Sequence, residues 1–129
     1  MKTKQFRDLL VWRRSMHLAE AVYAVARSFP KDEIFGLSSQ MRRAAVSVPS
    51  NIAEGFGRDS DRGFAVFLAQ ARGSLYELET QIEPAQNLGL IEAQRAAPLL
   101  ADAAEVGRML HGLRTALHHD VLAPSRSTR

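Results

Sequence analysis

The chain has 129 residues, of which 46% are hydrophobic and 24% charged, and it contains no cysteine. This length suits one domain, and this composition is typical of a folded protein. The absence of cysteine excludes disulfides, thiolate metal sites and thiol nucleophiles, and it indicates a cytoplasmic protein. The first residues lack the apolar core of a secretory signal and no later stretch reaches a membrane-spanning length, so we expect neither export nor membrane insertion.

The charge is unevenly distributed along the chain. The overall net charge is +3, but residues 1–72 carry +5, residues 73–120 carry −4, and the last residues carry +2. A basic half next to an acidic half indicates either an anionic partner or self-association through opposite faces. Ordinary solvated charge on helices is the alternative.

The first helix is predicted from Asp8, a plausible N-cap, to Phe29, before Pro30. It carries two apolar sets about 100° apart, and together they cover roughly half its circumference. The first set is predicted to face the core and contains Leu9, Trp12, Met16, Ala19, Tyr23 and Ala26. The second set is predicted to form an oligomer interface, unless the helix is central in the bundle, and contains Val11, Leu18, Val22, Val25 and Phe29.

Three further helices follow from the apolar spacing of three and four residues. They are predicted over residues 37–55, 60–88 and about 98–119, joined by short connections. No segment has the alternation of a strand. The chain is therefore predicted to be all-α, an up-down-up-down four-helix bundle over residues 1–119 with a flexible C-terminal tail over residues 120–129.

Prolines and glycines mark special positions in these helices. Pro49 and Pro84 are predicted to kink the helices that contain them, and Pro98 either kinks the fourth helix or marks its first turn. Gly55 is predicted to cap the second helix. Gly73, with the following serine, is predicted to permit close approach of another helix.

The second helix carries a narrow polar line with two interpretations. Its members are Arg43, Ser47, Ser50, Asn51 and Glu54. They form either a hydrogen-bonded seam or a contact in which Arg42 and Arg43 bind phosphates of nucleic acid. The positive charge continues through Arg58, Arg62 and Arg72, although neighbouring aspartates weaken it. Few aromatic residues are near, so any nucleic-acid binding is predicted to be electrostatic and weakly specific.

Catalytic readings find little support. No acidic residue lies three positions before a histidine, which excludes the di-iron carboxylate motif, and no glycine-rich phosphate loop is present. Arg114 and His119 have the spacing of helical-bundle ribonucleases, but about one such match is expected by chance. Glu79 and Glu83 share a helix face and are interpreted as solvated. We therefore predict no enzyme activity, no metal and no cofactor, with the ribonuclease and a pure protein-interaction scaffold as alternatives.

Several motifs resemble those of one family, the four-helix-bundle proteins encoded in 23S rRNA intervening sequences. The motifs are FRDLLVWRRSMHLAEAVY from Phe6, FPKDEIFGL from Phe29, FGLSSQMRRAAVSVPSNIAEGFGR from Phe35 and FLAQARGSLYELETQ from Phe67. The resemblance implies a homopentameric ring and no known enzyme activity. It also implies kinship with accessory proteins of diversity-generating retroelements, which bind nucleic acid and a reverse transcriptase. RNA, DNA, a reverse transcriptase and the chain itself are thus the expected partners.

Overall fold

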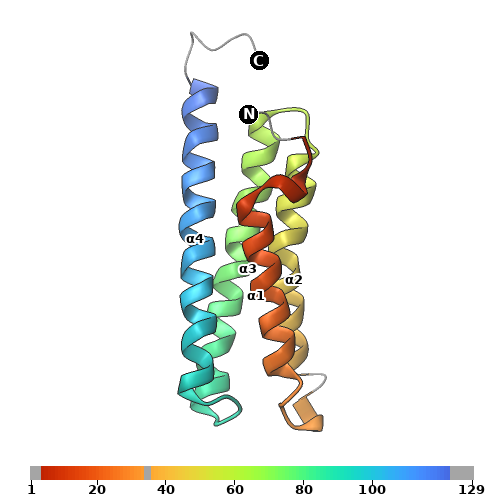
Figure 1. The fold of residues 1–129 in the computed structure, drawn as a ribbon, viewed down its shortest axis with the longest axis vertical. Coiled ribbons are helices and arrows are strands. Elements are labelled where there is room, and N and C mark those ends of the chain that lie inside the picture. The colour runs from red at the N-terminus through yellow and green to blue at the C-terminus, as the bar shows by residue number, and fades with distance from the viewer. Residues whose placement is uncertain (1–3, 34–35, 123–129) are drawn as a thin grey trace.

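The structure, a computed structural model, describes residues 4–33 and 36–122, the last five of these by their backbone alone. Its helices run alternately up and down one common axis (Figure 1). The described residues contain no strand, so the predicted all-α, up-down-up-down bundle is confirmed. The four long helices are α1 Leu10–Ala26, α2 Leu37–Phe56, α3 Asp61–Asn87 and α4 Ala93–Leu122, and the two 3-10 turns are η1 Phe6–Asp8 and η2 Lys31–Glu33.

Each helix packs against two neighbours. The neighbouring pairs are α1 with α2, α2 with α3, α3 with α4, and α4 with α1, and the backbones of diagonal pairs do not come close to each other within the described residues. No helix in the described part of the chain combines the length and the apolar character needed to cross a bilayer.

The helix ends follow local capping chemistry. Ser60 caps α3, because its hydroxyl accepts a hydrogen bond from the Gly63 amide at 3.0 Å. Asp8 does not cap α1 as predicted. It belongs to η1, where its carboxylate accepts from the Gln5 amide at 3.3 Å, and Leu9 stands at the start of α1 instead.

The prolines do not divide the helices. α2 continues through Pro49, α3 through Pro84 and α4 through Pro98. One missing amide in each helix costs less than the burial of the helix face gains, so packing keeps these helices continuous. α4 begins upstream of Pro98 and extends to Leu122, which is past the predicted end of the bundle, and residues 123–129 of the predicted tail lie outside the described residues.

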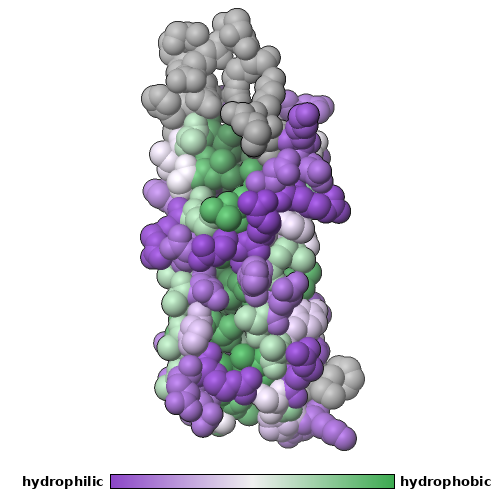
Figure 2. Space-filling view, in the orientation of Figure 1, coloured by the Kyte–Doolittle hydropathy of each residue, from purple (hydrophilic) through white to green (hydrophobic). Residues whose placement is uncertain are grey.

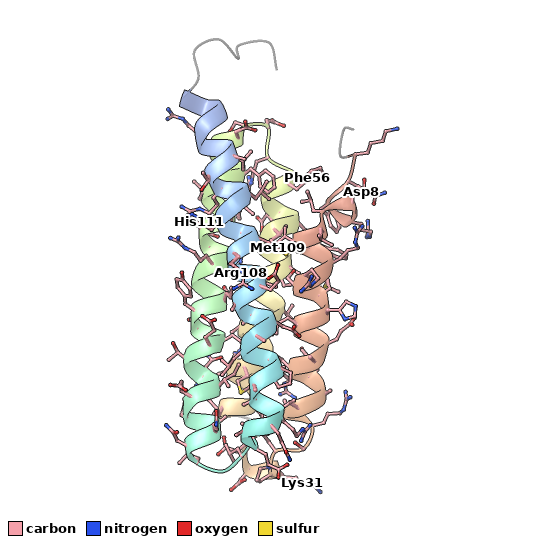
Figure 3. The ribbon with its side chains drawn as sticks, turned by 60° about the vertical axis from the view of Figure 1, so that its left-hand side comes forward. Asp8, Lys31, Phe56, Arg108, Met109 and His111 are labelled. Atoms are coloured by element: carbon pink, nitrogen blue, oxygen red, sulfur yellow. The ribbon has the colours of Figure 1, made fainter. Side chains whose placement is uncertain are left out.

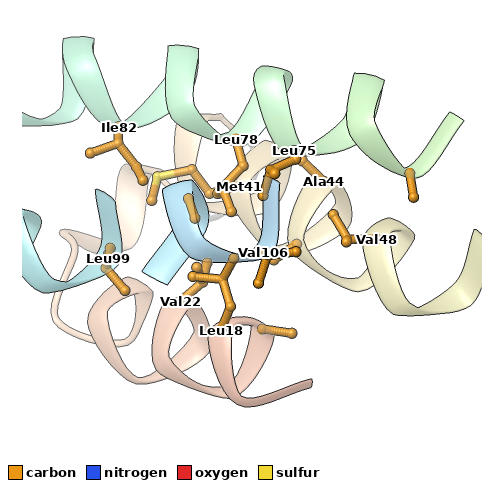
Figure 4. Close-up of a cluster of buried hydrophobic side chains, with 14 of the residues drawn as sticks. Leu18, Val22, Met41, Ala44, Val48, Leu75, Leu78, Ile82, Leu99 and Val106 are labelled. Carbon is orange, nitrogen blue, oxygen red and sulfur yellow. The ribbon is translucent and has the colours of Figure 1, made fainter. Parts of the chain in front are cut away.

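The core is one continuous cluster along the bundle axis, to which all four helices contribute (Figure 4). On the face shown in Figure 2, apolar residues form a band along this axis between polar surfaces. Fully burying one such side chain stabilises the fold by about 1.5 to 3 kcal/mol before entropy is considered. The largest fully buried side chains include Leu18, Val22, Met41, Val48, Ile52, Leu68, Leu75, Leu78, Ile82, Val106 and Leu110.

The two apolar sets of α1 are exchanged relative to the prediction. The predicted interface set of Val11, Leu18, Val22, Val25 and Phe29 is buried inside this one chain, so its assignment to an oligomer interface is wrong. Of the predicted core set, Ala19 and Ala26 are buried, Leu9, Trp12 and Met16 are half-buried, and Tyr23 is exposed.

A buried serine explains the exchange. Ser15 is fully buried and lies on the inner stripe, four residues after Val11 and three before Leu18. Its hydroxyl donates to the Trp12 carbonyl at 2.8 Å, which satisfies this polar group without a partner from another helix. A polar residue thus occupies a core position, and the sequence pattern conceals the true inner face.

α2 and α3 are in close contact at Gly55, which is not a cap because α2 continues to Phe56. A Cβ atom on Gly55 would lie 2.6 Å from the Phe67 Cβ and 3.2 Å from the Phe64 carbonyl oxygen. The close approach was predicted at Gly73 and Ser74. The Ser74 hydroxyl does contact the Ser47 hydroxyl of α2 at 2.8 Å, but Gly73 is exposed and a Cβ atom there would meet nothing within 4 Å.

Candidate functional site

The polar line on α2 divides between three environments. Ser47 faces α3, where its hydroxyl lies 2.8 Å from the Ser74 hydroxyl. Asn51 joins this contact by donating to the Ser47 hydroxyl at 3.0 Å and to the Ser47 carbonyl at 2.9 Å. Glu54 instead pairs with Arg58 at 3.1 Å on the surface, and Ser50 is exposed on the side toward α1. A hydrogen-bonded seam therefore exists, but it is limited to Ser47, Asn51 and Ser74.

The five candidate arginines do not form a single patch. Arg42 lies over the Tyr23 ring of α1 at 5.8 Å, whereas Arg72 lies over the Tyr76 ring of α3 at 5.9 Å. Arg58 pairs with Glu54 and lies over the Phe67 ring at 4.4 Å.

Two of these arginines are free of such contacts. Arg43 and Arg62 are exposed, and neither makes an ion pair or a ring contact with the described residues. Arg43 lines a polar recess between α2 and α3 together with Gln40 and Glu77. The positive charge is thus spread over several faces of the bundle.

A long apolar groove of about 610 Å³ lies between α1 and α2. Trp12, Met16 and Tyr23 form its α1 side, and Val46 and Pro49 form its α2 side. Tyr23 and Val46 are each 41% exposed. Three large members of the α1 set that was predicted to face the core, Trp12, Met16 and Tyr23, therefore line an open surface groove.

A second groove, of about 410 Å³, lies between α3 and α4 and contains the residues that the sequence analysis missed. Arg72 and Tyr76 line it from α3. Arg108 and His111, which are labelled in Figure 3, line it from α4. Only Arg72 was predicted as a contact residue. Two glycines in α4, at positions 107 and 112, are the sequence signal for this groove, because glycine in a helix interior costs stability and leaves an open surface.

Acid-base chemistry has little basis among the described residues. No group of three or more histidine, cysteine, aspartate or glutamate side chains is placed to hold a metal ion within them. Burial raises the pKa of Glu79 in the α3/α4 groove, but no basic side chain among the described residues forms a hydrogen bond or an ion pair with it. Arg114 is half-buried, and its Nε atom has no hydrogen-bond partner within the described structure. The side chain of His119, its proposed ribonuclease partner, lies outside the described residues.

A model of the 23S rRNA-intervening sequence protein family matches residues 7–112. The chain belongs to this family. The match includes most of the bundle and confirms the resemblance seen in the motifs of α1, α2 and α3. Among curated proteins, none matches the sequence.

A solved structure shares the fold of this chain. It is the crystal structure of a protein of unknown function from the S23 ribosomal protein family of Bacteroides thetaiotaomicron. The two chains are 21% identical, and the superposition has a TM-score of 0.74 and covers 81% of this chain and 98% of the other. At this identity the likeness shows the shared fold alone.

Proposed function

We propose that this protein is a non-enzymatic, self-assembling helical bundle, and that its assembled form binds nucleic acid or a nucleic-acid-associated protein. The observation that carries the proposal is the apolar groove between α1 and α2. Binding sites on proteins are typically concave and lined mainly by apolar and aromatic side chains, as this groove is. The resemblance to a ring-forming family makes a homopentamer the specific proposal.

A second copy of the chain suits this groove. From Trp12 to Tyr23 the groove follows α1 for about 16 Å, which is the length over which two helices pack. Glu20 and Arg27 stand at its margin with opposite charges, as a surface that pairs with protein would. A patch that meets a different patch on the next copy closes into a ring when the rotation permits it.

Light scattering coupled to size exclusion tests the assembly. We expect an assembly of about five subunits at micromolar concentration. Val46→Glu places a charge in the groove and should reduce the assembly to monomers. Val66→Glu is the matched control, because Val66 is 55% exposed on α3 and lies outside the groove. A wild-type monomer, or a Val46→Glu variant that assembles normally, would contradict the proposal.

The proposed nucleic-acid binding depends on assembly, because an oligomer carries several copies of each positive charge. A ring presents several copies of each exposed arginine, such as Arg43 and Arg62, to one polyanion, so weak contacts combine into measurable binding. Mobility shifts with RNA and DNA should weaken with salt, each phosphate contact contributing about 0.9 to the logarithmic slope on duplex DNA. Salt-insensitive binding, or no binding, would contradict the nucleic-acid part of the proposal and would favour a protein as the partner.

A further inference from the structure

The groove between α3 and α4 differs in chemistry from the α1/α2 groove. Its floor is apolar and consists of Leu75, Ala103 and Gly107. Charged and aromatic groups form its margins, with Arg72 and Tyr76 on one helix and Arg108 and His111 on the other. A flat apolar floor between cationic margins suits a ligand that is both planar and anionic.

The bundle itself does not require the groove to be open. A Cβ atom on Gly112 would meet nothing within 4 Å, and one on Gly107 would lie 3.4 Å from the Leu75 Cδ2, which is ordinary contact. Alanine is a much better helix former than glycine. Glycine at these two positions therefore lowers the stability of α4, and packing within the chain does not require it. Gly55 is the contrast, because there the neighbouring helix leaves no space for a side chain.

The polar groups of the groove are available to a ligand. Arg72 contacts the Tyr76 ring but has no acidic partner among the described residues. Arg108 pairs with Glu105, but its side chain is 69% exposed, and an exposed ion pair is weak enough for a phosphate to displace. Glu79 makes no hydrogen bond or ion pair with any described side chain and offers two acceptor oxygens.

We propose that this groove holds one nucleotide unit of a single-stranded nucleic acid, with the base against Tyr76 and the phosphate between Arg72 and Arg108. Tyrosine rings stack on bases of any sequence, and guanidinium groups bind phosphate oxygens in a bidentate manner. Glu79 accepts hydrogen bonds from the amino or imino groups of the base, and its charge directs the phosphate toward the arginines.

The dimensions favour a single strand over a duplex. Neighbouring helix axes lie about 8 to 10 Å apart, so the space between their outer side chains admits one strand but is narrower than a double helix. In a duplex the base faces are also covered by stacking and cannot reach Tyr76. This inference rests on the proposed nucleic-acid binding and assigns it to one site.

The test uses the full chain and fluorescence anisotropy at low salt with a labelled single-stranded RNA of about ten nucleotides, the same sequence as DNA, and the matching duplexes. Tyr76→Ala should weaken single-strand binding by about 5-fold to 150-fold, the range for loss of one stacked base. Gly112→Leu should weaken binding by at least about 5-fold by filling the groove, while its melting temperature should equal or exceed that of the wild type.

Val66→Leu is the matched control. Val66 is on α3, its side chain is 55% exposed, and it lies outside the α3/α4 groove. This variant adds an exposed leucine, as Gly112→Leu does, and should bind as the wild type does. Light scattering of each variant establishes that assembly is unchanged, so that a loss of binding is not a loss of avidity.

The binding measurements test the groove assignment separately from the proposed function. If the wild type binds single strands and both Tyr76→Ala and Gly112→Leu bind equally well, the groove assignment is wrong while the proposed function stands. Tighter binding of duplex than of single strand also overturns the groove assignment. A wild type that binds no nucleic acid under any of these conditions overturns both.

Discussion

The contact at Gly55 allows one substitution to be worked out in detail. Gly55→Ala improves helix propensity by about 1 kcal/mol, which on an open helix surface would stabilise the protein. Here the new methyl group would lie 2.6 Å from the Phe67 Cβ and 3.2 Å from the Phe64 carbonyl oxygen. Neither atom moves by a rotamer change, so α2 and α3 must separate. Overpacking of this kind costs about 3 kcal/mol at the upper end of its usual range, which leaves a net loss of about 2 kcal/mol.

Thermal unfolding followed by circular dichroism at fixed protein concentration measures this loss. For a domain of this size we expect a decrease in melting temperature of about 6 to 10 °C. Gly73→Ala provides the opposite case, because its Cβ position is open and the propensity gain should appear as a rise in stability of about 1 kcal/mol. The reasoning is refuted if Gly55→Ala is as stable as the wild type or more stable.

Two further variants test other parts of the structure. Leu18→Ala should lower the free energy of unfolding measured in urea by about 2 to 5 kcal/mol, because Leu18 lies in the core. Tyr23→Ala, on the outer side of α1, should lower it much less. Equal losses would contradict the observed orientation of α1. Burial raises the pKa of Glu79, so the folded state binds this proton more tightly than the unfolded state, and stability decreases as pH rises from the ordinary glutamate pKa through the raised one. Glu79→Gln should therefore melt at a higher temperature than the wild type near pH 7, and the difference should disappear below about pH 4.5; a difference that is constant over pH would exclude this cause.

The sequence predicts the helices well because each carries a long apolar stripe. Its spacing of three and four residues places α2 and α3 to within a few residues, and Ser60 marks the start of α3 through an ordinary capping hydrogen bond. The prolines were harder to interpret. At Pro49, Pro84 and Pro98 local chemistry favours a break or a bend, but burial of the helix face outweighs one missing amide.

The sequence could not determine which side of α1 faces inward. Both apolar sets have helical spacing, and the larger side chains, including Trp12 and Tyr23, belong to the outer set. The inner set is interrupted by Ser15, whose hydroxyl donates a hydrogen bond to the Trp12 carbonyl within the same helix turn. Burial therefore depends on the neighbouring helices, which no local pattern of α1 specifies.

The sequence also could not predict which side chains contact one another at the candidate sites. Arg42 and Arg43 are adjacent in the sequence, but one side chain lies over Tyr23 of α1 and the other borders a recess next to α3. The α3/α4 groove depends on Tyr76 meeting the glycines of α4, residues that are more than thirty positions apart. Such a juxtaposition exists only once the helices have packed.

The order of helix contacts also has a consequence for folding kinetics. Three of the four interfaces join helices that follow one another in the chain, and only the interface between α1 and α4 joins distant segments. Local contacts are formed quickly, whereas α1 and α4 must close a loop that contains both intervening helices. We therefore expect the three consecutive hairpins to form early, and the α1/α4 seam to be the last interface to close and the first to open. An opening at this seam leaves α1 packed against α2 as its one remaining long-helix neighbour, while α2, α3 and α4 stay paired; an intermediate of this kind would allow two copies to exchange their first helices.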